Sequence, residues 1–168
     1  MHSVNSIDFT KIVLTSPVTF ANGKQTATPF SERSNHVRFV SILYPTRKAQ
    51  FTFTATIVEV GALKAQFGDD SDYCKMKPYG KDLTNLEHLE NLPNIQPYKD
   101  NIGFNNEHYT QNRTLSDNYE LKIKLRKSEG KYKFETSMKN IATMCEGQKV
   151  EITVSPGYYF NEVDKKYG

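Results

Sequence analysis

Residues 119–137 read YELKIKLRKSEGKYKFETS, and this stretch decides the fold class that the sequence predicts. Apolar and polar side chains alternate on both sides of Glu129-Gly130, and a period of two is typical of half-buried β-strands. Glu129-Gly130 suits a two-residue turn, so the stretch predicts an antiparallel hairpin. The register then pairs Ser128 with Lys131, Arg126 with Lys133, Lys124 with Glu135 and Lys122 with Ser137.

The two faces of this hairpin differ in chemistry. Leu121, Ile123 and Leu125 form an apolar face that we expect to pack inward. The other face is cationic: residues 121–140 hold seven Lys or Arg against two Glu, whereas the whole chain carries a net charge of only +3. Like charges directly opposite each other destabilise a sheet unless an anion lies between them. The hairpin therefore predicts a polyanion-binding face, with a merely solvated face that discourages edge-to-edge aggregation as the alternative.

The rest of the chain also favours strands. The stretches 9–20, 36–44, 51–60 and 149–155 are rich in β-branched and aromatic residues, with Pro17 breaking the first and Gly61 marking a bulge or an end of the third. Residues at about 68–118 are rich in Asp, Asn, Tyr and Pro and predict an irregular insertion. It holds one short helix, opened by a capping box at Thr84 and Glu87 and stopped near Pro93. We expect a mostly β chain: a single OB-fold-like barrel of five to six strands, with a helix-containing insertion.

Composition limits the class of protein. The 168 residues suffice for one domain, 1–168, and the 20 Tyr and Phe argue against disorder. No apolar run is long enough to span a membrane, and the first residues lack a signal-peptide pattern, so we expect an intracellular protein. Two cysteines cannot form a disulfide framework.

Aromatic residues near the C-terminus favour single-stranded nucleic acid as the polyanion. Tyr158, Tyr159 and Phe160 follow one another, so alternation cannot bury all three, and at least one of the two tyrosines should face outward. Cations beside exposed rings are the usual device for holding single strands, because phosphates meet Lys or Arg while bases stack on the rings. Phe53 is a weaker stacking candidate, since a core position suits it better.

The stretch 147–161, GQKVEITVSPGYYFN, resembles the late barrel strand of the single-stranded DNA-binding replication proteins of short-tailed phages and related viruses, and 11–17, KIVLTSP, is similar to their opening strand. The resemblance implies an OB-fold that coats single-stranded DNA without sequence preference in viral or phage replication and recombination. It also implies contacts with replication proteins and a location in the bacterial cytoplasm or a eukaryotic nucleus. The family's acidic C-terminal tail has no counterpart here, and we expect the natural chain to continue beyond Gly168.

Two other functions remain open. A β-sandwich that binds protein, as a viral structural or host-interaction module, would use the long insertion for recognition. A metal-dependent nuclease is a weaker alternative, because Glu120-Leu121-Lys122 forms an E-x-K step that Asp100 or Asp117 could complete. The scattered histidines show no metal-ligand spacing.

The predicted function is therefore sequence-independent binding of single-stranded DNA, without catalysis, cofactor, metal or membrane. RNA binding and a homodimer stay open. The expected phosphate contacts are Lys122, Lys124, Arg126 and Lys133, helped by Arg38, Arg47 and Lys48; the expected stacking residues are Tyr158, Tyr159 and Phe53.

Overall fold

The computed structural model describes residues 2–21, 24–25, 36–63, 71–95, 98–99, 108–128, 131–132 and 146–168. The chain is mostly β, as predicted, with one α-helix among these residues. The strands are β1 (His2–Ser3), β2 (Val13–Leu14), β3 (Val18–Ala21), β4 (Lys24–Gln25), β5 (His36–Leu43), β6 (Phe51–Leu63), β7 (Ser71–Pro78), β8 (Thr110–Gln111), β9 (Leu121–Ser128), β10 (Lys131–Tyr132), β11 (Lys149–Val154), β12 (Gly157–Asn161) and β13 (Lys166–Tyr167). The helix is α1 (Gly80–Asn91). The described residues also form the 3₁₀ turns η1 (Val4–Ser6), η2 (Phe9–Lys11) and η3 (Leu92–Asn94).

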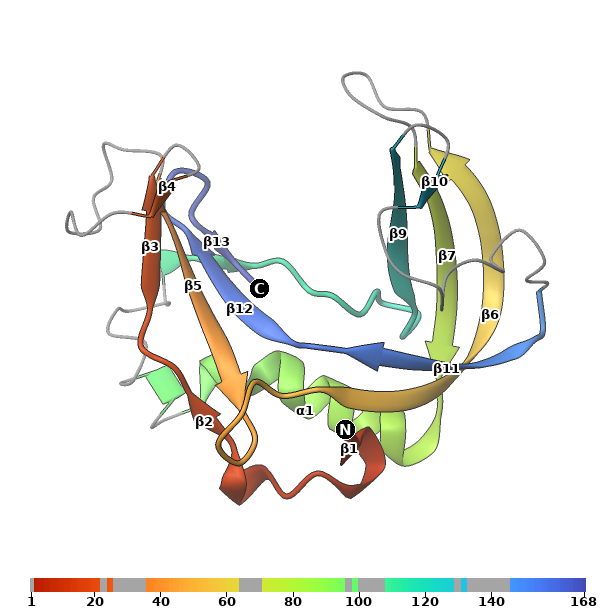
Figure 1. Ribbon diagram of the computed structural model, residues 1–168, viewed down its shortest axis with the longest axis horizontal. Helices are drawn as coiled ribbons and strands as arrows, with labels where there is room; N and C mark the ends of the chain where they lie inside the picture. The colour runs from red at the N-terminus through yellow and green to blue at the C-terminus, as the bar shows by residue number, and fades with distance from the viewer. Residues whose placement is uncertain are drawn as a thin grey trace. The chain divides into compact units, whose positions relative to one another are not determined.

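The strands form two mixed sheets (Figure 1). One has the order β1-β6-β7-β9-β10, with β11 also paired to β6; the other has the order β4-β3-β5-β12-β13-β8, with β2 paired to β5. Within the described ranges neither sheet closes into a barrel, so the single OB-fold barrel expected from the sequence is not confirmed.

The chain folds as two compact units, each assembled from separate segments. Unit 1 comprises residues 1–52, 84–114 and 153–168, and unit 2 comprises residues 53–83 and 115–152. The sequence alone predicted one domain, because no composition shift marks the points where the chain passes from one unit to the other.

In unit 1, β5 lies between β3 and β12, both antiparallel to it. Alternate side chains of β5 and β12 build the core: Val40, Ile42 and Phe160 are at most 1 % exposed. Each such side chain contributes about 1.5–3 kcal/mol by leaving water. On this inner face the Tyr158 hydroxyl donates a 2.6 Å hydrogen bond to the carbonyl of Leu89 in α1. That carbonyl lies four residues before Pro93, which has no N–H to donate, so Tyr158 satisfies a helix end that the sequence leaves open.

In unit 2, β7 lies between β6 and β9, and Figure 1 shows the three strands side by side. Phe53, Ala55 and Ile57 of β6 are buried with Cys74 and Met76 of β7. Leu121 of β9 is buried as predicted. The pairs Ser128–Lys131 and Lys127–Tyr132 have the predicted hairpin register, while residues 133–140 lie outside the described part of the chain.

Four local predictions were wrong. Residues 71–78, expected in a loop, form β7. The helix begins at Gly80, so Thr84 lies inside it and is not its N-cap. Gly61 is neither a bulge nor an end, because β6 runs on to Leu63 and its irregularity lies between Ile57 and Glu59. The predicted strand at 9–20 is a 3₁₀ turn followed by two short strands, β2 and β3.

Candidate functional site

The cationic strand predicted from the sequence, β9, pairs along its length with β7. Lys122 lies opposite Lys75, Lys124 opposite Tyr73, and Arg126 opposite Ser71. The β7 residues that lie opposite β9 therefore determine what surrounds the predicted phosphate contacts. Lys133 lies outside the described residues.

Strand β7 adds its own cations and an aromatic ring to this surface. Cys74 and Met76 are buried, with 1 % and 3 % exposure. The alternate residues Tyr73, Lys75 and Lys77 consequently lie on the opposite face, together with Lys122. We call Tyr73, Lys75, Lys77 and Lys122 the lysine–tyrosine face.

A cation–π contact orders the centre of this face. The Lys122 Nζ lies 4.5 Å from the centroid of the Tyr73 ring. Beyond the end of β7, the Lys77 Nζ lies 5.9 Å from the ring centroid of Tyr79, which is 55 % exposed. Cations and rings are thus interleaved, which is the arrangement that favours a strand of bases and phosphates.

The charges on this face are only partly balanced. Lys75 and Lys122 are directly opposite each other, which is destabilising for like charges. Glu59 of β6 forms an ion pair with Lys75 at 3.0 Å. The hydrogen bond from Lys75 is the main cause of the lowered pKa of Glu59, and the same bond raises the pKa of Lys75. Glu59 also attracts Lys122, and Glu120 attracts Lys75, so these two carboxylates offset part of the repulsion between the lysines. An added anion would offset more of it.

The Tyr73 ring lies against a glycine of the neighbouring strand β6. Gly61 is its register partner on β6, and a Cβ there would lie 2.6 Å from ring atoms of Tyr73. The ring therefore lies across the glycine backbone, a pairing in which an aromatic side chain covers the gap that glycine leaves in a sheet. Partial burial and a hydrogen bond to Glu59 raise the pKa of Tyr73, so its hydroxyl stays protonated at neutral pH.

Unit 1 holds the other predicted residues apart from Phe53, and those that belong to β5 and β12 lie on two different faces of this strand pair. Tyr158 is 5 % exposed and Arg38 follows the same inner face as Val40 and Ile42. Tyr158 therefore offers no stacking surface, whereas Arg38 is half-buried. In unit 2, Phe53 is 2 % exposed and belongs to the core. The predicted stacking roles of Tyr158 and Phe53 are corrected for the same reason: alternation along the strand directs their side chains inward. The phosphate contact expected of Arg38 stays a prediction.

The outer face of β5 and β12 carries a hollow of about 220 Å³. Phe39, which is 47 % exposed, and the half-buried Tyr159 lie directly opposite each other on its floor. Lys48 reaches the same hollow, because it bridges to Leu43 at the end of β5. A hydrogen bond of 2.8 Å from the Tyr44 N–H to the Arg47 carbonyl closes the turn that presents Lys48. Arg47 is exposed in that turn.

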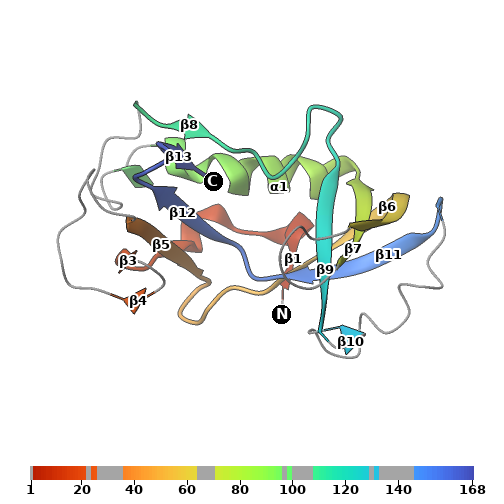
Figure 2. The ribbon, with the colours of Figure 1, turned by 90° about the horizontal axis from the view of Figure 1, so that it is seen from above.

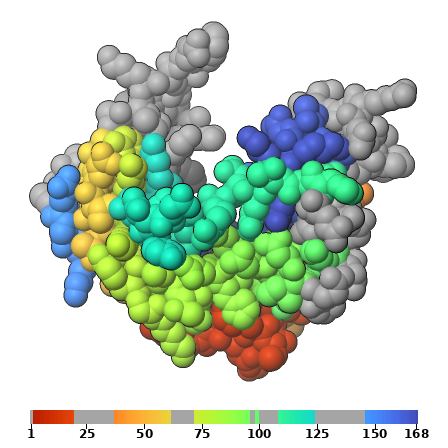
Figure 3. All heavy atoms as spheres, turned by 180° about the vertical axis from the view of Figure 1, so that it is seen from behind, coloured from red at the N-terminus to blue at the C-terminus, as the bar shows by residue number. Residues whose placement is uncertain are grey.

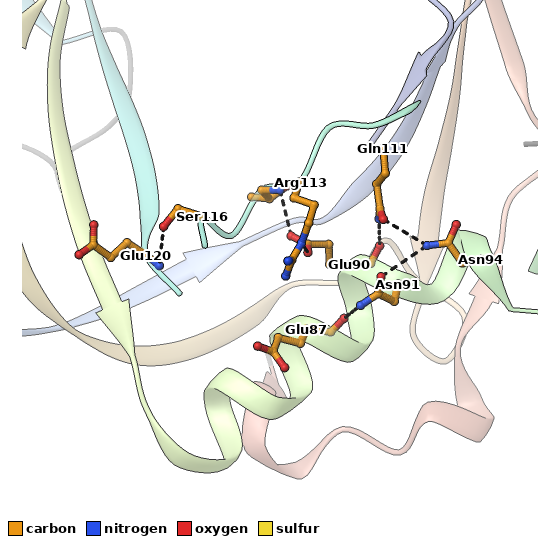
Figure 4. Close-up of polar contacts among 9 residues, drawn as sticks. Glu87, Glu90, Asn91, Asn94, Gln111, Arg113, Ser116 and Glu120 are labelled. Atoms are coloured by element: carbon orange, nitrogen blue, oxygen red, sulfur yellow. Dashed lines mark hydrogen bonds and ion pairs between the residues drawn. The ribbon is translucent and has the colours of Figure 1, made fainter. Parts of the chain in front are cut away.

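Residues 108–114, the strap, hold Tyr159 in place. Asn112 Nδ2 donates to the Tyr159 hydroxyl at 3.0 Å. The strap runs along α1 (Figures 2 and 3), to which Glu90 binds it: this carboxylate accepts from Arg113 Nε at 2.8 Å and from the Thr114 N–H at 2.9 Å (Figure 4). Gln111 Nε2 donates to the carbonyl of Glu90 at 3.2 Å.

The nuclease alternative is tested only through those of its residues that the structure describes. Glu120 directly precedes β9, and its N–H donates to the Ser116 hydroxyl at 3.1 Å, an ordinary turn contact (Figure 4). Across the described residues, no three His, Cys, Asp or Glu side chains are grouped closely enough to hold a metal ion. Asp100 lies outside those residues. None of the described helices has the length and apolar character needed to cross a bilayer.

Sequence reasoning missed Tyr73, Lys75, Lys77 and Phe39. The signal for the first three was present in residues 73–77, YCKMK, where apolar and charged side chains alternate around Cys74 and Met76. Phe39 carried no such signal, because both faces of the stretch 36–44 include apolar side chains.

Comparison with protein-family models, curated proteins and solved structures finds no match to this chain. The resemblance to phage single-stranded DNA-binding proteins therefore stays a prediction, and the site is interpreted from its own geometry.

Proposed function

We propose that this protein binds single-stranded DNA without sequence preference. The observation that carries the proposal is the lysine–tyrosine face, where β7 adds Tyr73, Lys75 and Lys77 to the cations predicted on β9. A protein-binding sandwich has no need of like charges held opposite each other, whereas phosphates would neutralise them. A closed barrel is not required, because open sheets with outward aromatic side chains also bind single strands.

Non-specific binding of this kind depends on released counterions. For a single strand, log K falls with log salt by about 0.7 for each phosphate neutralised. Two described cations of this face, the exposed Lys122 and the half-buried Lys77, form no ion pair among the described residues. We therefore expect these two lysines to contact phosphates.

The test is fluorescence anisotropy with a labelled thirty-nucleotide oligo-dT at several salt concentrations. We expect binding that an equal-length duplex does not displace. The double variant Lys77→Gln/Lys122→Gln should bind more weakly, with a salt slope lower by about 1.4 for two lost phosphates. The matched control is Lys149→Gln/Lys166→Gln, which removes the same charge from exposed lysines elsewhere.

Each outcome of this binding experiment tests one part of the proposal. Absence of binding at low salt contradicts the proposal and makes the protein-binding β-sandwich the favoured hypothesis. An unchanged slope in Lys77→Gln/Lys122→Gln shows that the lysine–tyrosine face is only solvated. A competing oligo-rU of the same length determines whether RNA is bound as well.

A further inference from the structure

Strand β7 is followed by an exposed aromatic ring beside the lysine–tyrosine face. Tyr79 is 55 % exposed, whereas Pro78 before it is fully buried and pairs with Ala55 of β6. The helix α1 begins at the next residue, Gly80, whose φ of 59° lies in the left-handed region that favours glycine. The Leu83 N–H donates to the Tyr79 carbonyl at 3.4 Å. The backbone of Tyr79 is therefore held on both sides, while its ring meets solvent.

The tyrosine inside the lysine–tyrosine face, Tyr73, is already engaged by both neighbouring strands. Its ring lies against the Gly61 backbone of β6. On the other side of β7, the Lys122 Nζ of β9 lies 4.5 Å from the ring centroid. The Tyr73 hydroxyl is hydrogen-bonded to Glu59, and the residue is half-buried. Tyr73 therefore orders its neighbours within the protein, and Tyr79 is the better stacking surface for a ligand.

Lys77 places a cation beside the exposed Tyr79 ring. Its Nζ lies 5.9 Å from the ring centroid, close to the outer limit of about 6 Å for a cation–π contact. This contact is looser than the 4.5 Å contact between Lys122 and Tyr73. Lys77 also forms no ion pair with the rest of the described chain. A flat ring attached to an anion matches this pair, because the ring stacks on Tyr79 and the anion meets the Lys77 ammonium.

We propose that the Tyr79 ring stacks with one unpaired base of the bound strand, with Lys77 contacting the adjoining phosphate, and that this stacking makes the protein select single strands over duplex. This inference rests on the proposed function and extends it. Lysines attract the phosphates of single and double strands alike. Stacking tolerates any sequence, because every base has a π-face. A base that is paired and stacked inside a duplex cannot lie on the Tyr79 ring, so this ring distinguishes the two forms.

The test compares the affinities for three ligands: oligo-dT, a duplex of equal length, and an abasic deoxyribose-phosphate strand. Tyr79→Ala should lower the affinity for oligo-dT about fivefold to a hundredfold and leave the other two affinities unchanged. The matched control is Tyr79→Phe, which keeps the ring, removes only the hydroxyl and should bind all three ligands like the unsubstituted chain. Urea unfolding checks that both variants fold.

A further variant keeps the test decisive if Tyr79→Ala unfolds. The chain contains no tryptophan, so Tyr79→Trp introduces a single reporter whose fluorescence should be quenched by oligo-dT and not by the abasic strand.

The outcomes separate this inference from the function on which it rests. An unchanged affinity of Tyr79→Ala for oligo-dT, or equal losses for oligo-dT and the abasic strand, contradicts the stacking role and leaves the proposed function intact. Quenching of Tyr79→Trp by the abasic strand contradicts the stacking role as well. If the unsubstituted chain binds none of the three ligands at low salt, the proposed function itself fails and this inference falls with it.

Discussion

Gly61 is the residue on which the geometry of the lysine–tyrosine face depends most directly. A methyl group at this position would lie 2.6 Å from the Tyr73 ring. We expect Gly61→Ala to destabilise the protein by about 1–3 kcal/mol, because the ring must move or the strands must separate. The measurement is the free energy of unfolding in urea.

The double-mutant cycle gives this prediction its control. In a Tyr73→Ser background the ring is gone, and Gly61→Ala should be neutral or stabilising by about 0.5–1 kcal/mol, since alanine restricts the unfolded chain more than glycine does. If Gly61→Ala costs the same in both backgrounds, the ring does not cover the glycine.

The burial of Tyr158 makes the free energy of unfolding depend on pH in the alkaline range. Burial is the main cause that raises its pKa well above the model-compound value of 10.0. The folded chain thus keeps a proton that the unfolded chain loses, so this stabilisation is complete below about pH 10 and declines as the pH rises further. Tyr158→Phe should cost about 1–2 kcal/mol at pH 7.5, where the Leu89 carbonyl loses its donor, and less at pH 10.5.

Urea unfolding at the two pH values measures this difference, with Tyr119→Phe as the exposed control. A cost that is the same at pH 7.5 and 10.5 would show that the Tyr158 phenol titrates alike in both states.

At the scale of elements, the strap is held to α1 chiefly through one carboxylate. The Glu90 side chain is 7 % exposed and Arg113 is 42 % exposed. Arg113→Ala removes the cation that pairs with a nearly buried carboxylate, which keeps the hydrogen bond from the Thr114 N–H. We expect a loss of about 1–2 kcal/mol, at the low end for a charged hydrogen bond because Arg113 is partly solvated.

The free energy of unfolding in urea measures this loss. Lys11→Ala is its control, because the ion pair of Lys11 with Asp8 is exposed and 4.0 Å long, and should contribute little. Equal effects of the two substitutions would mean that Glu90 does not anchor the strap.

Strand β7 shows how far sequence reasoning could reach at this scale. Strands β5, β6, β9, β11 and β12 each carry enough apolar residues to be predicted alone. Strand β7 buries only two side chains between a Ser–Asp start and a proline, and its neighbours β6 and β9 supply the pairing that makes it a strand. Only one of the four residues of the lysine–tyrosine face, Lys122, was therefore predicted, and tertiary pairing supplied the other three.

At the scale of the whole molecule, the mostly β class follows from the sequence, whereas the division into two units does not. Alternation reports which side chains of a strand are buried, but not which distant strand lies beside it. Tyr158 and Tyr159 show the same limit. The sequence established that three consecutive rings cannot share one face, yet the pairing of β12 with β5 decided that Tyr159, and not Tyr158, faces outward.

The segmented make-up of unit 1 also affects its biosynthesis. Its central strand β5 pairs with β12, which a ribosome makes only after all of unit 2. The nascent chain therefore holds β5 with the edge that later pairs with β12 still unpaired for most of translation. Chains in that state are prone to aggregate and are common clients of chaperones. Late-forming contacts of this kind also slow folding, so yield in the cell should depend more on translation rate and chaperone supply than on the stability of the finished protein.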